Sequence, residues 1–395
     1  MWLLGFFLHE MAFGLLSIFL PLYVTGGAVD GTLVDIGIMT SLATFLAIPF
    51  SFLWGYLSDK TRHYKLFILL SFSSLTILLY AFTMTNHILV LTFLFVTIAI
   101  AHVAHEPSKN VLIAESCSRP EWEKSFASYE LLTELGWLIG LLLGFFMSIQ
   151  GFNGASILLL CSFLNLAAFL SSAIFVVDPT FIFERGLASM ERTLNFAQRG
   201  ITLALKATEG QILEDKFRGE SLSAFCAALV LFSLATSTLF TPLPIFFSKN
   251  LTLEPSLVFA IYTMNSGGAC IGYLLTRHMA QLKDRSGRGK AKTIALVRGL
   301  LTLALTTSIL YVSVSTRLMA IVILAAMGFA YALFLASTLS ISMELLPEGK
   351  AGLFNVLVSL GAAVGCLLGP LIAANFGFLH VFVASSVIFL LSYLA

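Results

Sequence analysis

Twelve apolar runs of roughly 20 residues constrain the fold of this chain more than any other feature. A run of that length spans the hydrocarbon core of a bilayer as an α-helix. The sequence predicts spans at 1–24, 33–57, 64–84, 88–113, 124–149, 153–177, 219–248, 255–279, 291–314, 317–343, 350–375 and 377–395. Charged residues make up only 11% of the 395 positions, about half of their share in soluble proteins. We therefore expect an all-α membrane protein that crosses the bilayer twelve times.

A long polar connection divides the twelve spans into two sets of six. In residues 178–218, apolar side chains recur at three- and four-residue steps with basic residues on the other face. This pattern is typical of an amphipathic helix that lies on the cytoplasmic leaflet as a strap between two halves. Binding of a partner protein is the weaker alternative. The expected domains are a six-helix bundle over 1–177, the linker over 178–218 and a second six-helix bundle over 219–395.

Short motifs repeat in the same order in both halves. Ile18–Leu22 aligns with Leu239–Leu243, Gly55–Leu57 recurs as Gly272–Leu274, and Gly136, Gly140 and Gly144 recur as Gly361, Gly365 and Gly369. Duplication of a six-helix unit is typical of carriers that rock two halves around a central site. Glycines at four-residue spacing also form a smooth stripe along a helix, so we assign these six glycines to close helix packing.

The basic residues predict the orientation of the spans. Nineteen of the 22 Lys and Arg residues lie in connections that follow even-numbered spans. Because Lys and Arg accumulate on the cytoplasmic side, both termini are expected to be cytoplasmic, in the cell membrane.

With this arrangement and the stretch Gly55–Arg62 between spans 2 and 3, the chain resembles the major facilitator superfamily. Arg62, His63 and Tyr64 stand where that family usually has Gly followed by two basic residues. The resemblance implies two pseudo-symmetric six-helix bundles and a cytoplasmic gate, which we assign to Gly55, Asp59, Lys60, Arg62 and Glu115. Glu115 is then the acidic partner of Arg62 or Lys60.

A physical argument supports Asp59 independently. Unsatisfied N–H groups at a helix N-terminus attract a carboxylate, and span 11 is expected to begin on the same side of the membrane. Asp59 is therefore expected to latch the two halves together there, whereas the alternative is a solvated loop carboxylate.

Span 4 carries the most unusual chemistry. His102, His105, Glu106 and Lys109 follow the spacing i, i+3, i+4, i+7 and would share one face of a continuous helix. Ionisable groups inside a membrane are costly unless they line a water-filled cavity, and the resemblance implies that spans 1, 4, 7 and 10 line one. These four residues are therefore candidates for the substrate cavity.

Span 1 adds His9 and Glu10. Glu10 lies roughly 14 Å along the helix from the cytoplasmic end and has no neighbouring cation in the sequence. A carboxyl group in this position can take up and release protons near neutral pH, so Glu10 is our first candidate for proton coupling. Glu130 and Glu134, at the start of span 5, are left without a role.

Two alternatives for span 4 remain open. Glu106 and Lys109 neutralise each other while the histidines line the cavity, or His102, His105 and Glu106 form the metal or acid/base site of a membrane-embedded enzyme. No further ligand stands at a compelling spacing, so neither a metal nor a cofactor is expected.

The predicted function is secondary active transport and not enzymatic catalysis. No Gly-x-x-x-x-Gly-Lys-Ser/Thr loop is present, which argues against an ATP-driven pump. The sequence predicts a monomer that moves a small organic solute by alternating access, coupled to protons. The expected partners are the solute, H⁺ and membrane lipid, without nucleic acid. The sequence names neither the solute nor the direction of its flux.

Overall fold

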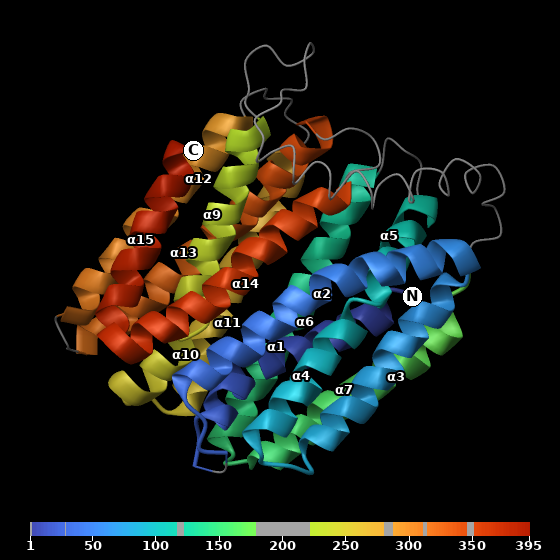
Figure 1. The fold of residues 1–395 in the computed structure, drawn as a ribbon, viewed down its shortest axis with the longest axis horizontal. Coiled ribbons are helices and arrows are strands. Elements are labelled where there is room, and N and C mark those ends of the chain that lie inside the picture. Colours follow the sequence, from blue (N-terminus) through green and yellow to red (C-terminus); the bar gives the residue numbers. More distant parts are fainter. Residues whose placement is uncertain are drawn as a thin grey trace.

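Long antiparallel helices build the described part of the molecule, which a computed structural model covers at residues 2–27, 29–116, 122–178, 222–279, 287–310, 314–345 and 351–395 (Figure 1). The first set comprises α1 (Leu4–Val24), α2 (Leu33–Thr61), α3 (Tyr64–Phe82), α4 (Ile88–His102), α5 (His105–Ser116), α6 (Trp122–Ile149) and α7 (Gly154–Phe175). The second set comprises α9 (Leu222–Phe240), α10 (Leu243–Ile245), η2 (Phe246–Asn250), α11 (Pro255–Met279), α12 (Gly287–Leu310), α13 (Val314–Leu345), α14 (Ala351–Phe376) and α15 (Phe378–Leu394).

These helices form two bundles of six spans each, because α4 with α5, and α9 with α10 and η2, each make one span. Among the described residues, ten helices are long and apolar enough to cross a membrane, and α12 and α15 complete the two sets. The predicted all-α, twelve-span fold in two bundles is confirmed. The predicted strap over 178–218 lies outside the described residues except for Asp178, which accepts a hydrogen bond from the Lys65 backbone N–H at 2.7 Å.

The prediction of one continuous helix for span 4 is wrong. The helix breaks at Val103 and Ala104, between α4 and α5. The physical reason is Pro107, which has no N–H to donate to the carbonyl of Val103 and is tolerated only in the first turn of a helix. Span 7 is likewise interrupted after α9, where Pro242 and Pro244 follow Phe240.

The two bundles meet most closely at one end of the molecule. We call the end where α1 begins and α15 finishes the terminal side, and the opposite end the far side. Near the far side, Gly37 of α2 packs against Pro370 of α14, and Gly144 of α6 packs against the Phe259 ring of α11. One apolar core there includes residues of both bundles, among them Phe19 and Phe246. Contact between α6 and α11 also continues toward the terminal side, where Leu131 packs against a cluster that includes Ala269 and Tyr273.

Five of the six predicted stripe glycines lie at close helix contacts within their own bundle, and Gly144 is the exception. A Cβ on Gly140 would clash with the carbonyl oxygen of Met11, so α6 lies directly against the backbone of α1. In the second bundle, a Cβ on Gly365, the counterpart of Gly140, would clash in the same way with the carbonyl oxygen of Leu234, which places α14 against α9. The first two glycines of each stripe thus occupy equivalent interfaces in both halves, whereas Gly369 meets Thr238 of its own bundle and Gly144 meets Phe259 of the other.

Candidate functional site

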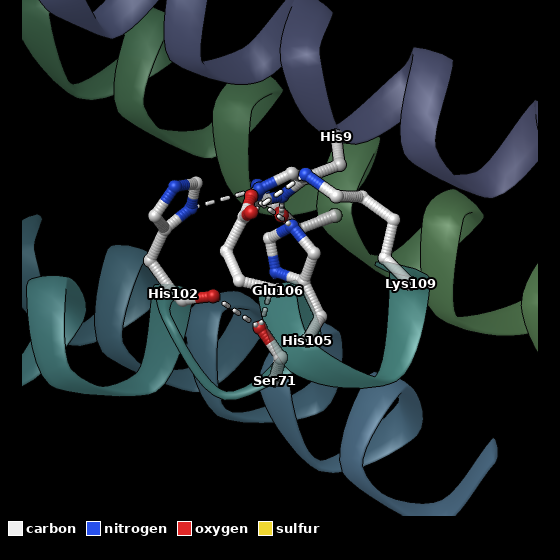
Figure 2. A network of polar contacts seen from close by, with 7 residues as sticks. His9, Ser71, His102, His105, Glu106 and Lys109 are labelled. Atoms are coloured by element: carbon white, nitrogen blue, oxygen red, sulfur yellow. Dashed lines mark hydrogen bonds and ion pairs between the residues drawn. The ribbon is translucent and has the colours of Figure 1, made fainter. Parts of the chain in front are cut away.

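Three histidine side chains meet inside the first bundle (Figure 2). His9 comes from α1, while His102 and His105 lie on either side of the break between α4 and α5. His9 Nε2 is 3.0 Å from His102 Nδ1, and one ring nitrogen from each histidine lies within 4.8 Å of the others. His9 and His105 are fully buried and His102 is partly buried. The helix break therefore brings together residues that a regular helix would only have stacked along one face.

Asn165 of α7 fixes the protonation pattern of His9. The Asn165 amide nitrogen donates to the carbonyl oxygen of Cys161 at 2.9 Å, which turns its amide oxygen toward His9 Nδ1, 2.8 Å away. Because an amide oxygen only accepts, His9 Nδ1 carries the proton. In the neutral ring, His9 Nε2 then presents its lone pair to His102.

His105 is held from α3 and retains one ring nitrogen without a hydrogen bond. Its Nδ1 lies 3.3 Å from the Ser71 hydroxyl oxygen, which is also 3.4 Å from the backbone carbonyl of His102 (Figure 2). Its Nε2 is buried without a hydrogen-bond partner, although Glu106 Oε1 lies 3.4 Å away. Glu106 is therefore the polar group that this ring nitrogen faces.

Glu106 and Lys109 form an ion pair beside the histidines. Lys109 Nζ donates to Glu106 Oε2 at 2.6 Å and lies 4.7 Å from the ring centroid of Tyr129 on α6. Lys109 is buried, whereas about one third of the Glu106 side chain is exposed, at 32%. This geometry fits the expectation that the two charges neutralise each other.

Glu10 is partly buried on α1, with its Cβ next to Gly136 of α6. It lies within electrostatic reach of Lys109, Glu106 and Glu130. The geometry does not test whether Glu10 carries the coupling proton, so that role stays a prediction.

Glu134 of α6 connects the two bundles, a role that the sequence reasoning missed. Its Oε1 accepts a hydrogen bond of 2.5 Å from the Ser266 hydroxyl on α11. The spacing of Glu130 and Glu134, one turn apart on a predicted span, was the available signal. The serine partner could not have been named, because it depends on how the bundles pack.

Arg298 of α12 is the second missed residue. It is almost fully buried, donates to the Thr236 hydroxyl at 3.0 Å and has four aromatic rings around its guanidinium. The distances to the ring centroids lie between 5.1 and 5.6 Å for Phe232, Phe240, Tyr331 and Phe389. Arg298 is therefore held by π faces and a hydroxyl group.

The predicted gate residues lie at the terminal side. Asp59, Lys60 and Arg62 are exposed, and a Cβ on Gly55 would be in ordinary contact with Pro107 at 3.7 Å. Arg62 ends α2 with φ 58°, a left-handed conformation that glycine adopts without strain, which explains why the resembled family has Gly there. Residues 346–350 and the Glu115 side chain lie outside the described part, so the latch of Asp59 onto span 11 stays a prediction.

Comparisons with known proteins agree with this architecture. The sequence profile of the Major Facilitator Superfamily matches residues 2–359, whereas no curated protein matches the sequence significantly. The solved structure of the nucleoside transporter NupG has a TM-score of 0.67 at 14% identity and covers 100% of this chain and 97% of its own. A POT family transporter in complex with 5-aminolevulinic acid has a TM-score of 0.72 at 13% identity, covering 100% and 94%. At these identities the likeness concerns the fold.

Proposed function

Because the chain belongs to the Major Facilitator Superfamily, we propose that it moves a small organic solute across the membrane by alternating access, coupled to protons. Membership in this family identifies the chain as a transporter and not an enzyme. The predictions of the family and of the transporter class are therefore confirmed, and the alternative hypothesis of a membrane-embedded enzyme is rejected. The solute and the proton coupling are our proposal.

The observation that carries the proton coupling is the hydrogen bond between Glu134 and Ser266. Alternating access requires the contacts between bundles to break and re-form. When α6 and α11 separate, Glu134 loses its hydroxyl donor and must be solvated or protonated, because an unpaired carboxylate is costly in a poorly hydrated place. Protonation therefore shifts the balance between the two conformations.

The groups that face Glu134 make its charge sensitive to its surroundings. They are Glu130 on its own helix, Glu10 on α1, Cys270 and Tyr273 on α11, and Tyr331 on α13. None of these neighbours is a cation, so Glu134 has no fixed positive partner among them. Among the described residues Glu134 makes no salt bridge, so its proton can be exchanged without breaking one there.

The solute is proposed to contact Glu10 and Glu106, two carboxylates of the first bundle that are only partly buried. His9 and His105 were predicted to line the cavity, but both are fully buried inside the first bundle. We therefore assign these two histidines a role other than contact with the solute.

The terminal side is proposed to be cytoplasmic, from the distribution of Lys and Arg in the sequence. A cysteine at Asp30, on the far side, should react with an impermeant maleimide in intact cells, and protection until lysis would reverse the orientation.

Proteoliposome transport tests the coupling. The protein is offered a panel of labelled solutes with and without a pH gradient. The panel starts with nucleosides and 5-aminolevulinic acid, because one structural neighbour is a nucleoside transporter and another was solved in complex with 5-aminolevulinic acid. We expect wild-type protein to accumulate a solute only with the gradient. Glu134→Gln should lose accumulation but retain counterflow, since exchange needs only the conformational cycle.

The matched control is Glu254→Gln, an exposed carboxylate after η2, which should behave as wild type. Full pH-driven accumulation by Glu134→Gln would remove Glu134 from the coupling. Accumulation by wild-type protein without any pH gradient would contradict proton coupling altogether.

A further inference from the structure

We propose that His9, His102 and His105 bind one divalent transition-metal ion inside the first bundle. Each offers a ring nitrogen, and the three nitrogens lie within 4.8 Å of one another. The ligands come from two spans, and His9 and His102 are 93 residues apart in the sequence. The spacing of residues along the sequence therefore did not reveal the site.

The distances are close to those of a metal centre. Imidazole nitrogens bind Zn²⁺ at about 2.0–2.1 Å, so two such ligands in a tetrahedral site are about 3.3 Å apart. His9 Nε2 and His102 Nδ1 are 3.0 Å apart, joined by a hydrogen bond that an ion would replace. The third nitrogen lies within 4.8 Å of these two.

The surroundings orient the rings as metal ligands require. A ligating histidine usually donates its other N–H to an oxygen, which fixes the tautomer. Asn165 Oδ1 does this for His9 Nδ1, and the Ser71 hydroxyl oxygen lies beside His105 Nδ1. The remaining nitrogen of His105 is buried and has no hydrogen-bond partner. Glu106 Oε1 is its nearest polar neighbour, at 3.4 Å, and an ion bound to this nitrogen would lie next to that carboxylate.

The donor set indicates the class of metal. Three imidazoles suit Zn²⁺, Co²⁺, Ni²⁺ or Cu²⁺, whereas Mg²⁺ and Ca²⁺ prefer oxygen ligands. Glu106 Oε1, 3.4 Å from His105 Nε2, places a negative charge beside the site, while its other oxygen is held by Lys109.

The site would act as a clamp on the first bundle. Its ligands flank the break between α4 and α5 on one side and belong to α1 on the other. A bound ion would hold the broken span against α1, and two fully buried ligands favour a resident ion over transported cargo.

Metal binding to the purified full-length chain tests the proposal. The protein carries an affinity tag without histidines, is treated with a chelator and is titrated with Zn²⁺ by calorimetry and with Co²⁺ by visible absorption. We expect one equivalent per chain, with Co²⁺ giving the intense bands of a tetrahedral site. Binding of no ion by wild-type protein would overturn the proposal and leave a cluster joined only by hydrogen bonds.

Matched variants locate the site. His102→Gln should weaken Zn²⁺ binding at least tenfold, whereas the triple variant of the exposed histidines His63, His87 and His380 to Gln should bind as wild type. Loss of binding only in the triple variant would assign the ion to the surface.

Asn165 provides a second comparison that leaves all three ligands in place. Asn165→Leu should weaken binding about 10- to 100-fold, and Asn165→Asp, which retains the oxygen acceptor for His9, should restore it. Equal affinity in both Asn165 variants, or wild-type affinity in His102→Gln, would contradict the site.

Discussion

The two bundles bury a cation in different ways. In the first bundle, Lys109 lies 2.6 Å from Glu106, so one charge is balanced by another. In the second bundle, Arg298 lies among four aromatic rings and donates to Thr236, and within the described part of the chain it makes no ion pair. The second arrangement suits a guanidinium, which is flat and weakly hydrated and stacks on rings, better than an ammonium group.

This difference separates the parts of the molecule whose side chains can gain or lose a proton near neutral pH from the parts whose side chains cannot. Histidines and carboxylates with replaceable partners gather in the first bundle and at the Glu134 contact, whereas Arg298 has neutral partners that do not titrate near neutral pH. The duplication has therefore kept the helix packing in both halves while the chemistry has diverged. We expect substitutions to show this asymmetry directly.

The largest effect is expected for Lys109→Met. Removing one partner of a buried ion pair costs about 3–5 kcal/mol, and the partial exposure of Glu106 reduces this to about 3 kcal/mol of unfolding free energy. Thermal unfolding in detergent measures the loss. Glu106→Gln in the same chain should restore most of it, because the carboxylate that Lys109 contacts directly is then neutral as well. A double variant as unstable as Lys109→Met would show that Lys109 acts through other contacts.

A smaller and symmetric effect is expected at the duplicated glycines. Gly140→Ala and its counterpart Gly365→Ala each place a methyl group against a carbonyl oxygen of the neighbouring helix, which should cost about 1–3 kcal/mol. Gly267→Ala is the control, because no atom lies within 4 Å of its added Cβ, and it should be neutral or slightly stabilising. Thermal unfolding of the three variants makes the comparison. Loss of stability in only one of the two bundles would contradict their equivalent packing.

Features that depend on local sequence were predictable, and features that depend on packing were not. The spans follow from hydropathy alone, and the glycine stripes follow from a four-residue spacing. The break after His102 was predictable in principle from Pro107, but the apolar run concealed it. The contact between His9 and Asn165 joins residues 156 positions apart, and the contact between Glu134 and Ser266 joins residues 132 apart. Such pairs become neighbours only when the helices are assembled.

The smallest effect is expected for Arg298→Met, which tests the aromatic side of the comparison. The variant loses attraction to the rings, worth about 2 kcal/mol for a desolvated cation, but it also removes the need to bury a charge. Thr236 keeps a partner because its hydroxyl already donates to the carbonyl oxygen of Phe232 at 2.8 Å. The net loss should be about 1 kcal/mol in thermal unfolding. Arg298→Lys should cost more, since a strongly hydrated ammonium must still be buried without the flat stacking surface. If Arg298→Met were as damaging as Lys109→Met, Arg298 would have an anionic partner, and the two bundles would bury their cations in the same way.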